Sequence, residues 1–265
     1  FVSLYIYYTV DEFQVTTNDR LEVGIALNSI SVGRIGLISS ALACFLLLKG
    51  HLKVVYKLLL VGVMMIGVTI MLRAGSRGPL LSLIAILLVF IYSNTKNKLT
   101  NLFFVLVFIA LFSLSFDYIL SFIADFAPAL ARRLTRDEGQ LYDRMFYYEQ
   151  AWNGFIQSPI WGKSLGIYRN NHLSYSHNIL LDALLQWGII GGAMLIGIIV
   201  STLKRISISI QERMEILWFS IILIILLMGL MVSGSMYSNP EFSIALVTFM
   251  LLFEKESKIL KFNHG

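Results

Sequence analysis

The sequence of 265 residues is poor in charged side chains and in cysteine. Only 14% of its residues are Asp, Glu, Lys or Arg, whereas a soluble domain has roughly a quarter. The single cysteine, Cys44, lies within an apolar run, which indicates a small packed residue and excludes a disulfide framework or a cysteine-based metal site. The sequence also lacks an internal repeat, an Asp-x-Asp pair and the His-Glu-x-x-His spacing of metal enzymes.

Apolar residues are abundant instead. They make up 57% of the chain, and its mean hydropathy is +0.75. Runs near 20 residues are long enough for a helix to cross the hydrocarbon core of a bilayer. We therefore predict an all-α, polytopic membrane helical bundle of about seven spans. The expected spans are 29–48, 54–72, 79–93, 99–120, 177–201, 215–236 and 239–253.

Basic residues are concentrated in every second connection between the expected spans, and this pattern predicts the topology. Eleven of the 21 Lys and Arg residues fall in the first, third and fifth connections and after the last span, which the positive-inside rule assigns to the cytoplasm. The net charge of +5 therefore reflects membrane topology and does not indicate a nucleic-acid partner. Because the chain begins at Phe1 and shows no signal peptide, we expect further spans upstream in a longer protein.

This topology predicts three parts. Residues 1–120 hold an extracytoplasmic N-terminal segment and four spans, residues 121–176 form one long extracytoplasmic loop containing helices, and residues 177–265 hold three spans and a cytoplasmic tail. The ten remaining basic residues, on or near the outer side, are nine Arg and one Lys. Arg matches phosphate or carboxylate with a rigid fork of donors, so this bias favours a bound anion. Attraction to lipid headgroups is the alternative.

Three arginines are expected close together at the outer surface. Arg34 lies a few residues inside the first span, while Arg73 and Arg77 belong to the turn between the second and third spans. A charge within a span usually faces the protein interior or a wet cavity. Pro79 suits the first turn of the next helix, whose free N–H groups attract anions. The turn alone is equally well explained as an interfacial cap.

The long loop and the span after it hold the other candidates. Arg144, Tyr148 and Trp152 recur at four-residue spacing, as on one face of a helix that Ser158-Pro159 ends. The loop's aromatic residues favour an interfacial belt over sugar stacking. His177 and Asn178 stand where the chain re-enters the membrane, with Asp182 one turn on and with Gly188 and Gly192 spaced for close helix packing. His177 is a helix-end residue or a proton acceptor.

Three stretches, taken in order, resemble the O-antigen polymerase and O-antigen ligase family. They are SRGPLL (76–81), DRMFYYEQAWNGFIQSPIWGKSLG (143–166) and SHNILLDALLQWGIIGG (176–192). The resemblance implies a bacterial membrane glycosyltransferase of the C type that uses no cofactor, nucleotide sugar or metal. It also implies an active site on the outer side of the cytoplasmic membrane. One departure is Gln186, near which many relatives have an acidic residue; either Asp182 takes the role of that residue in this chain or the role is absent.

The resemblance implies a glycan carried on undecaprenyl pyrophosphate as the substrate. Arg77 and Arg144 would then contact the pyrophosphate and His177 would stand at the reaction centre. From their charge and depth we add Arg34 and Arg73 as substrate contacts. The other predicted substrate contacts are Asn178, Asp182 and Trp152. Membrane lipids, a chain-length regulator and a flippase are the expected partners. We expect the arginines and His177 to share one cavity.

The function that we favour is a polymerase that joins lipid-linked repeat units into a surface polysaccharide, and two alternatives remain at this point. A ligase that moves finished glycan onto lipid A–core or another acceptor would use the same donor. A transporter of organic anions or lipid-linked glycans would use the arginines only for binding, but transporters usually show internal repeats and helices interrupted near the midplane.

Overall fold

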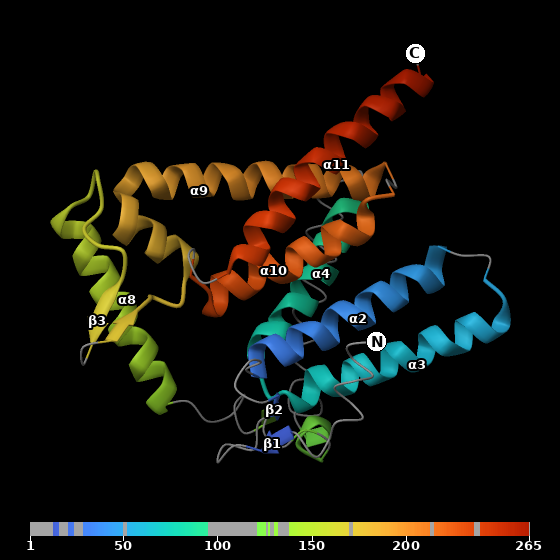
Figure 1. Cartoon of the computed structure of the whole chain (residues 1–265), viewed down its shortest axis with the longest axis horizontal. Coiled ribbons are helices and arrows are strands. Elements are labelled where there is room, and N and C mark those ends of the chain that lie inside the picture. Colours follow the sequence, from blue (N-terminus) through green and yellow to red (C-terminus); the bar gives the residue numbers. More distant parts are fainter. Residues whose placement is uncertain are drawn as a thin grey trace. The chain divides into compact units, whose positions relative to one another are not determined.

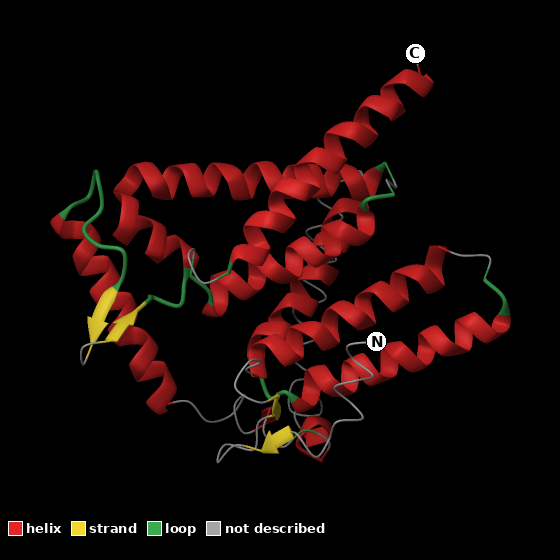
Figure 2. Cartoon of the chain, in the orientation of Figure 1, coloured by secondary structure: helices red, strands yellow, loops and turns green. Residues whose placement is uncertain are grey.

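Helices form most of the described chain, and they begin and end close to the apolar runs of the sequence (Figure 1, Figure 2). The chain divides into two compact units, residues 1–136 and 137–265. The computed structural model describes residues 13–15, 21–23, 29–49, 52–94, 121–125, 127, 130–131, 138–169, 172–212, 215–235 and 239–264.

The first unit is built on an antiparallel pair of long apolar helices, which lie side by side in Figure 1. These are α2 (Ser29–Lys49) and α3 (Val54–Arg73), followed by α4 (Arg77–Asn94). Val32 of α2 packs against Ile70 and Ala74. A short hairpin of β1 (Phe13–Val15) and β2 (Leu21–Val23) is an addition that the all-α prediction missed.

Small residues let α2 and α3 approach closely. A Cβ added to Gly36 would lie 2.6 Å from the carbonyl oxygen of Gly67, and a Cβ added to Gly67 would lie 2.3 Å from Oγ of Ser40. The Ser40 hydroxyl also donates across the pair to the Met64 carbonyl at 3.1 Å. Membrane helices associate through such close packing and polar contacts, because lipid supplies little hydrophobic drive between them. Cys44, expected to be packed, is instead exposed on α2.

Gly67→Val should therefore destabilise the first unit, by about 1–3 kcal/mol, because the added methyl groups push into backbone and Ser40. Thermal unfolding in detergent would measure the effect. Gly62→Val on the same helix is the matched control, because no atom lies within 4 Å of a Cβ added at Gly62. Equal unfolding temperatures for the two variants would contradict close packing at Gly67.

The second unit is built around its longest helix. It contains α8 (Glu138–Gln157), β3 (Ile167–Arg169), β4 (His172–Ser174), α9 (Ile179–Gln211), α10 (Leu217–Ser233) and α11 (Pro240–His264). Ala151 of α8, Ile167 of β3 and Leu185 of α9 form one buried cluster. The Arg205 guanidinium of α9 lies 5.9 Å from the centre of the Phe253 ring on α11. The Glu256 carboxylate of α11 accepts the backbone N–H of Ile216, just before α10.

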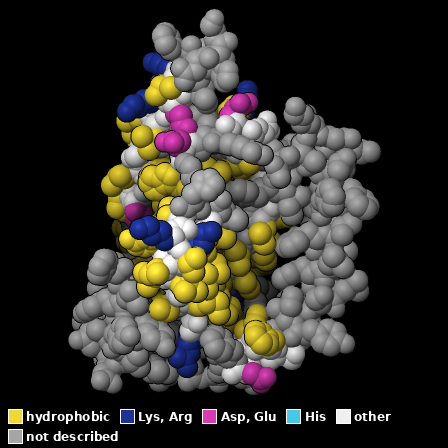
Figure 3. All heavy atoms as spheres, turned by 90° about the vertical axis from the view of Figure 1, so that its right-hand side faces the viewer, with side chains coloured by type: hydrophobic (Ala, Val, Ile, Leu, Met, Phe, Trp, Pro, Cys, Tyr) yellow, Lys and Arg dark blue, Asp and Glu magenta, His cyan; other side chains and the backbone are white. Residues whose placement is uncertain are grey.

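Three of the described helices, α2, α3 and α9, are long and apolar enough to cross a membrane, and shorter apolar helices cover Arg77–Val89 and Leu217–Ser233. Many large apolar side chains on these helices are exposed, as an integral membrane protein requires. Figure 3 shows hydrophobic side chains over most of the described part of one face. Six of the seven expected runs are helices, and the run 99–120 lies outside the described residues. The count of about seven spans and the C-type fold stay predictions.

Candidate functional site

The ring of His177 contacts two tyrosine rings in the second unit. Its ring centre lies 4.4 Å from that of Tyr175 and 5.6 Å from that of Tyr147 on α8. The His177 backbone is left-handed, with φ of 60°. A residue with a Cβ rarely adopts this conformation, which costs roughly 1–2 kcal/mol and persists where neighbouring contacts impose it.

Hydrogen bonds on both sides of His177 impose that conformation. One Asp182 carboxylate oxygen accepts the backbone N–H of Ser176 at 2.9 Å and pairs with the Ser176 hydroxyl at 2.7 Å. Ser176 and Asp182 are both buried. The bonds tie the residue before His177 to the first turn of α9. Asp182, predicted as a substrate contact, thus supports the backbone that presents His177.

Asn178 begins α9. Its side-chain oxygen accepts the N–H groups of Leu180 and Leu181 at 3.0 and 3.2 Å, which is the usual way a helix start is capped. Its amide nitrogen donates to the Met231 carbonyl on α10 at 3.2 Å. These three bonds use both ends of the Asn178 side chain within the protein and fix the start of α9.

The electrostatic setting favours neutral histidine. Burial lowers the pKa of His177, and the positive charge of Arg144 on α8 lowers this pKa further. Both act in the same direction because each disfavours the imidazolium form. The ring nitrogen Nδ1 of His177 is buried, and it has no hydrogen-bond partner among the residues that the structure describes. A neutral imidazole with an unused nitrogen is able to accept a proton.

Trp152 lies away from this arrangement. The α8 residues that pack against α9 include Tyr147 and Ala151, whereas Trp152 is 48% exposed and stacks at 5.3 Å on Phe155. The expected helix containing Arg144, Tyr148 and Trp152 is present and ends at Gln157, before Ser158-Pro159 as predicted. Trp152 nevertheless does not join the rings around His177 in the described structure.

The loop after α8 supports the start of α9 through its backbone. The N–H of Lys163 donates to the Leu185 carbonyl at 2.7 Å, and the N–H of Ile189 donates to the Pro159 carbonyl at 2.7 Å. These bonds occupy groups freed by a break in α9 at Gly188, where φ is 62° and ψ is −155°. The prediction that Gly188 serves close helix packing is therefore wrong: Gly188 allows the backbone of this loop to approach a broken helix.

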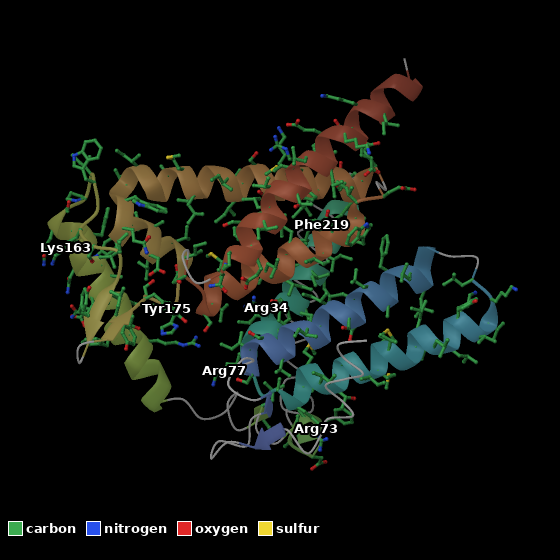
Figure 4. The ribbon with its side chains drawn as sticks, viewed as in Figure 1. Arg34, Arg73, Arg77, Lys163, Tyr175 and Phe219 are labelled. Carbon is green, nitrogen blue, oxygen red and sulfur yellow. The ribbon has the colours of Figure 1, made fainter. Side chains whose placement is uncertain are left out.

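The predicted arginines of the first unit lie around one turn. Arg34 is on α2, and both Arg34 and Arg77, the first residue of α4, are partly buried. A Cβ added to Gly33 would lie 2.8 Å from Cγ of Pro79, so α2 touches the first turn of α4 next to Arg34. Arg73 is exposed at the end of α3, and Figure 4 shows its side chain apart from Arg34 and Arg77.

Sequence reasoning missed three neighbours of His177, which are Tyr175, Tyr147 and Ser176. Tyr147 belongs to the run Phe146-Tyr147-Tyr148, and the sequence gives no reason to choose one of these rings. The burial of Ala151, one turn later on α8, shows which side of the helix faces inward. Ser176 is the residue that pairs with Asp182. Within the described ranges, no group of three or more His, Cys, Asp and Glu residues could hold a metal ion.

Comparison with known proteins identifies the family. The family model described as O-antigen ligase matches residues 62–196, which is half of the chain and includes Arg77, Arg144 and His177. No curated protein and no solved structure matches the chain. The matched segment contains all three stretches on which the resemblance was based. This integral membrane protein belongs to the O-antigen ligase family, whose activity is glycan transfer in polysaccharide biosynthesis.

Proposed function

We propose that this chain is a glycosyltransferase that joins oligosaccharide repeat units carried on undecaprenyl pyrophosphate into a surface polysaccharide. The site faces the outer side of the bacterial cytoplasmic membrane. The observation that carries the proposal is the state of His177: a partly buried imidazole, kept neutral by burial and by Arg144, within the segment that matches the family.

The reaction joins a sugar hydroxyl to the anomeric carbon of the donor glycan. The hydroxyl oxygen forms the new bond and passes its proton to His177, while the bond from the anomeric carbon to the pyrophosphate oxygen breaks. The carrier pyrophosphate leaves with the electron pair of that bond. A general base of this kind contributes about 10²–10⁴ in rate.

Guanidinium groups would stabilise the leaving pyrophosphate. Arg144 and Arg77 are assigned to this role, because the bond that breaks transfers negative charge to a phosphate oxygen and Arg matches phosphate with two parallel donors. Arg34, which is beside the turn that carries Arg77, would add positive charge. No metal or nucleotide enters the proposed step. A flippase would deliver the donor, and a chain-length regulator would act on the product.

A ligase is the second candidate, because the matching family model is described as O-antigen ligase. Polymerase and ligase share the donor and differ in the acceptor. They can be separated by the material that accumulates when the protein is lost. Single repeat units on the final acceptor indicate a polymerase, whereas full-length chains left on the lipid carrier indicate a ligase.

Complementation tests the proposal directly. Arg144→Ala and His177→Ala would be expressed in a host that lacks the gene, and the surface glycan would be separated on a gel. We expect each variant to accumulate normally in the membrane and to lose the polymer ladder. A full ladder from both variants would reject the site, and an unchanged glycan in the host without the gene would reject glycan transfer as the function.

Arg77→Lys probes the shape of the cation. Lysine keeps the charge but loses the bidentate fork, and one lost charge-assisted hydrogen bond costs about 1.5 kcal/mol, or on the order of tenfold in rate. We expect a fainter and shorter ladder at normal protein level. Arg205→Lys on α9 is the control, because Arg205 is not among the predicted site residues and lies in the connection assigned to the cytoplasm. A full ladder from Arg77→Lys would indicate that Arg77 serves topology alone.

A further inference from the structure

The break at Gly188 divides α9 into a short first part and a long straight part. In Figure 1 the first turns of α9 run in a different direction from the rest. The straight part, 189–211, has about 23 residues and rises roughly 35 Å, enough for a hydrocarbon core of about 30 Å. Lys204 and Arg205 lie toward its far end, which the positive-inside rule assigns to the cytoplasm. Gly188 therefore stands at the outer boundary of this straight part.

The loop after α8 is fixed to this boundary by backbone contact. A Cβ on Gly188 would lie 2.3 Å from the Ile160 carbonyl oxygen, and a Cβ on Gly162 would lie 2.3 Å from the Gln186 carbonyl oxygen. With the two hydrogen bonds already described, these contacts place 159–163 directly against 185–189. The loop is thus at the same depth as the start of the straight part of α9.

Large apolar side chains on this loop are exposed. Trp161 is 76% exposed and Leu165 is 70% exposed. Ile160, whose backbone carbonyl lies next to Gly188, also has an exposed side chain. Trp187 and Ile189 on either side of the break are exposed as well, and Ile189 begins a series of exposed apolar residues along α9. The loop therefore lies beside the exposed apolar surface of a helix that is long and apolar enough to cross a membrane. Exposed patches of this kind mark interaction sites.

We propose that the loop 159–165 is a membrane anchor that inserts Ile160, Trp161 and Leu165 into the outer headgroup region. The occupant of this surface is lipid, because the surface is continuous with a membrane-spanning helix and because Trp prefers the interface, where its ring is half apolar and its N–H is hydrated. The anchor would hold the start of α9, with the preceding His177, near the headgroups. It is independent of whether the protein acts as polymerase or ligase.

Site-specific fluorescence tests the anchor on the full chain. Cys44 is the only cysteine, so Cys44→Ser provides a background in which Trp161→Cys or Leu165→Cys carries a single environment-sensitive NBD label. The protein would be placed in vesicles of phosphatidylcholine and phosphatidylglycerol. Quenching by lipids spin-labelled near the headgroup would be compared with quenching by aqueous iodide. Asn153→Cys is the control, because Asn153 is an exposed polar position on α8.

We expect the labels at 161 and 165 to emit at shorter wavelength than the label at 153. We also expect severalfold stronger quenching by spin-labelled lipid and severalfold weaker quenching by iodide. Both residues are mostly exposed, so the substitutions remove little packing, and Leu165→Cys decides the matter if Trp161→Cys does not fold. Iodide quenching equal to that at 153 would overturn the anchor. Protection from both quenchers would overturn it too, because protein would then cover the loop.

Discussion

His177→Asn is expected to lower the rate of glycan transfer by about 10²–10⁴, the usual contribution of a general base. Asparagine is the informative replacement because it tolerates the left-handed backbone at this position. It therefore removes the proton acceptor while sparing the strained turn between Ser176 and Asn178. The loss should appear in kcat, with donor binding changed little, because the base acts when the acceptor hydroxyl attacks.

The measurement needs purified protein in vesicles, a synthetic undecaprenyl-pyrophosphate oligosaccharide as donor, and product analysis on a gel. His172→Asn, on the neighbouring strand β4, is the matched control, and its rate should stay near that of the unchanged protein. A folded His177→Asn protein with an undiminished rate would show that another group takes the proton. The contacts of His177 with the two tyrosines would then be structural.

The helices were predictable because apolar length alone defines them. The expected spans 29–48 and 54–72 differ by one residue at most from α2 and α3, since lysines and the Arg73 turn bound both runs. The α9 break was not predictable in the same way. A glycine in an apolar run suits close helix packing and a helix break equally, and only contact with 159–163, distant in sequence, decides between them.

Sequence selects the candidate site residues by type and position, but it does not give their geometry. His177 was selected by residue type and position, and its surroundings in the second unit agree with a proton acceptor. Asn178 and Asp182 were predicted as substrate contacts, yet both form hydrogen bonds that shape the turn. Polar residues at a helix start suit either role, and sequence does not distinguish them. The prediction of one cavity shared by Arg34, Arg77 and His177 concerns two separately described units and stays a prediction.

Arg144→Gln should have two separable effects, because the Arg144 cation is proposed to act on both the donor and the base. Loss of one preplaced donor to the leaving pyrophosphate should lower kcat by about 10²–10³. The second effect is on pH dependence. Arg144 lowers the pKa of His177, so removing its charge raises that pKa. Because the base must be neutral, kcat/KM falls as pH falls through the pKa, and the acid limb should move to higher pH.

Arg144→Lys separates the two effects. Lysine keeps the positive charge, so the acid limb should stay near its original pH while the rate still falls from loss of the fork. Lys163→Gln is the control for charge alone, since it removes an exposed cation from the same unit and should move neither rate nor limb. If the limb of Arg144→Gln stays in place while the rate falls, Arg144 acts on the donor and not on His177. If the acid limb moves but kcat is unchanged at high pH, where His177 is neutral, then Arg144 sets the pKa of His177 and another cation holds the pyrophosphate.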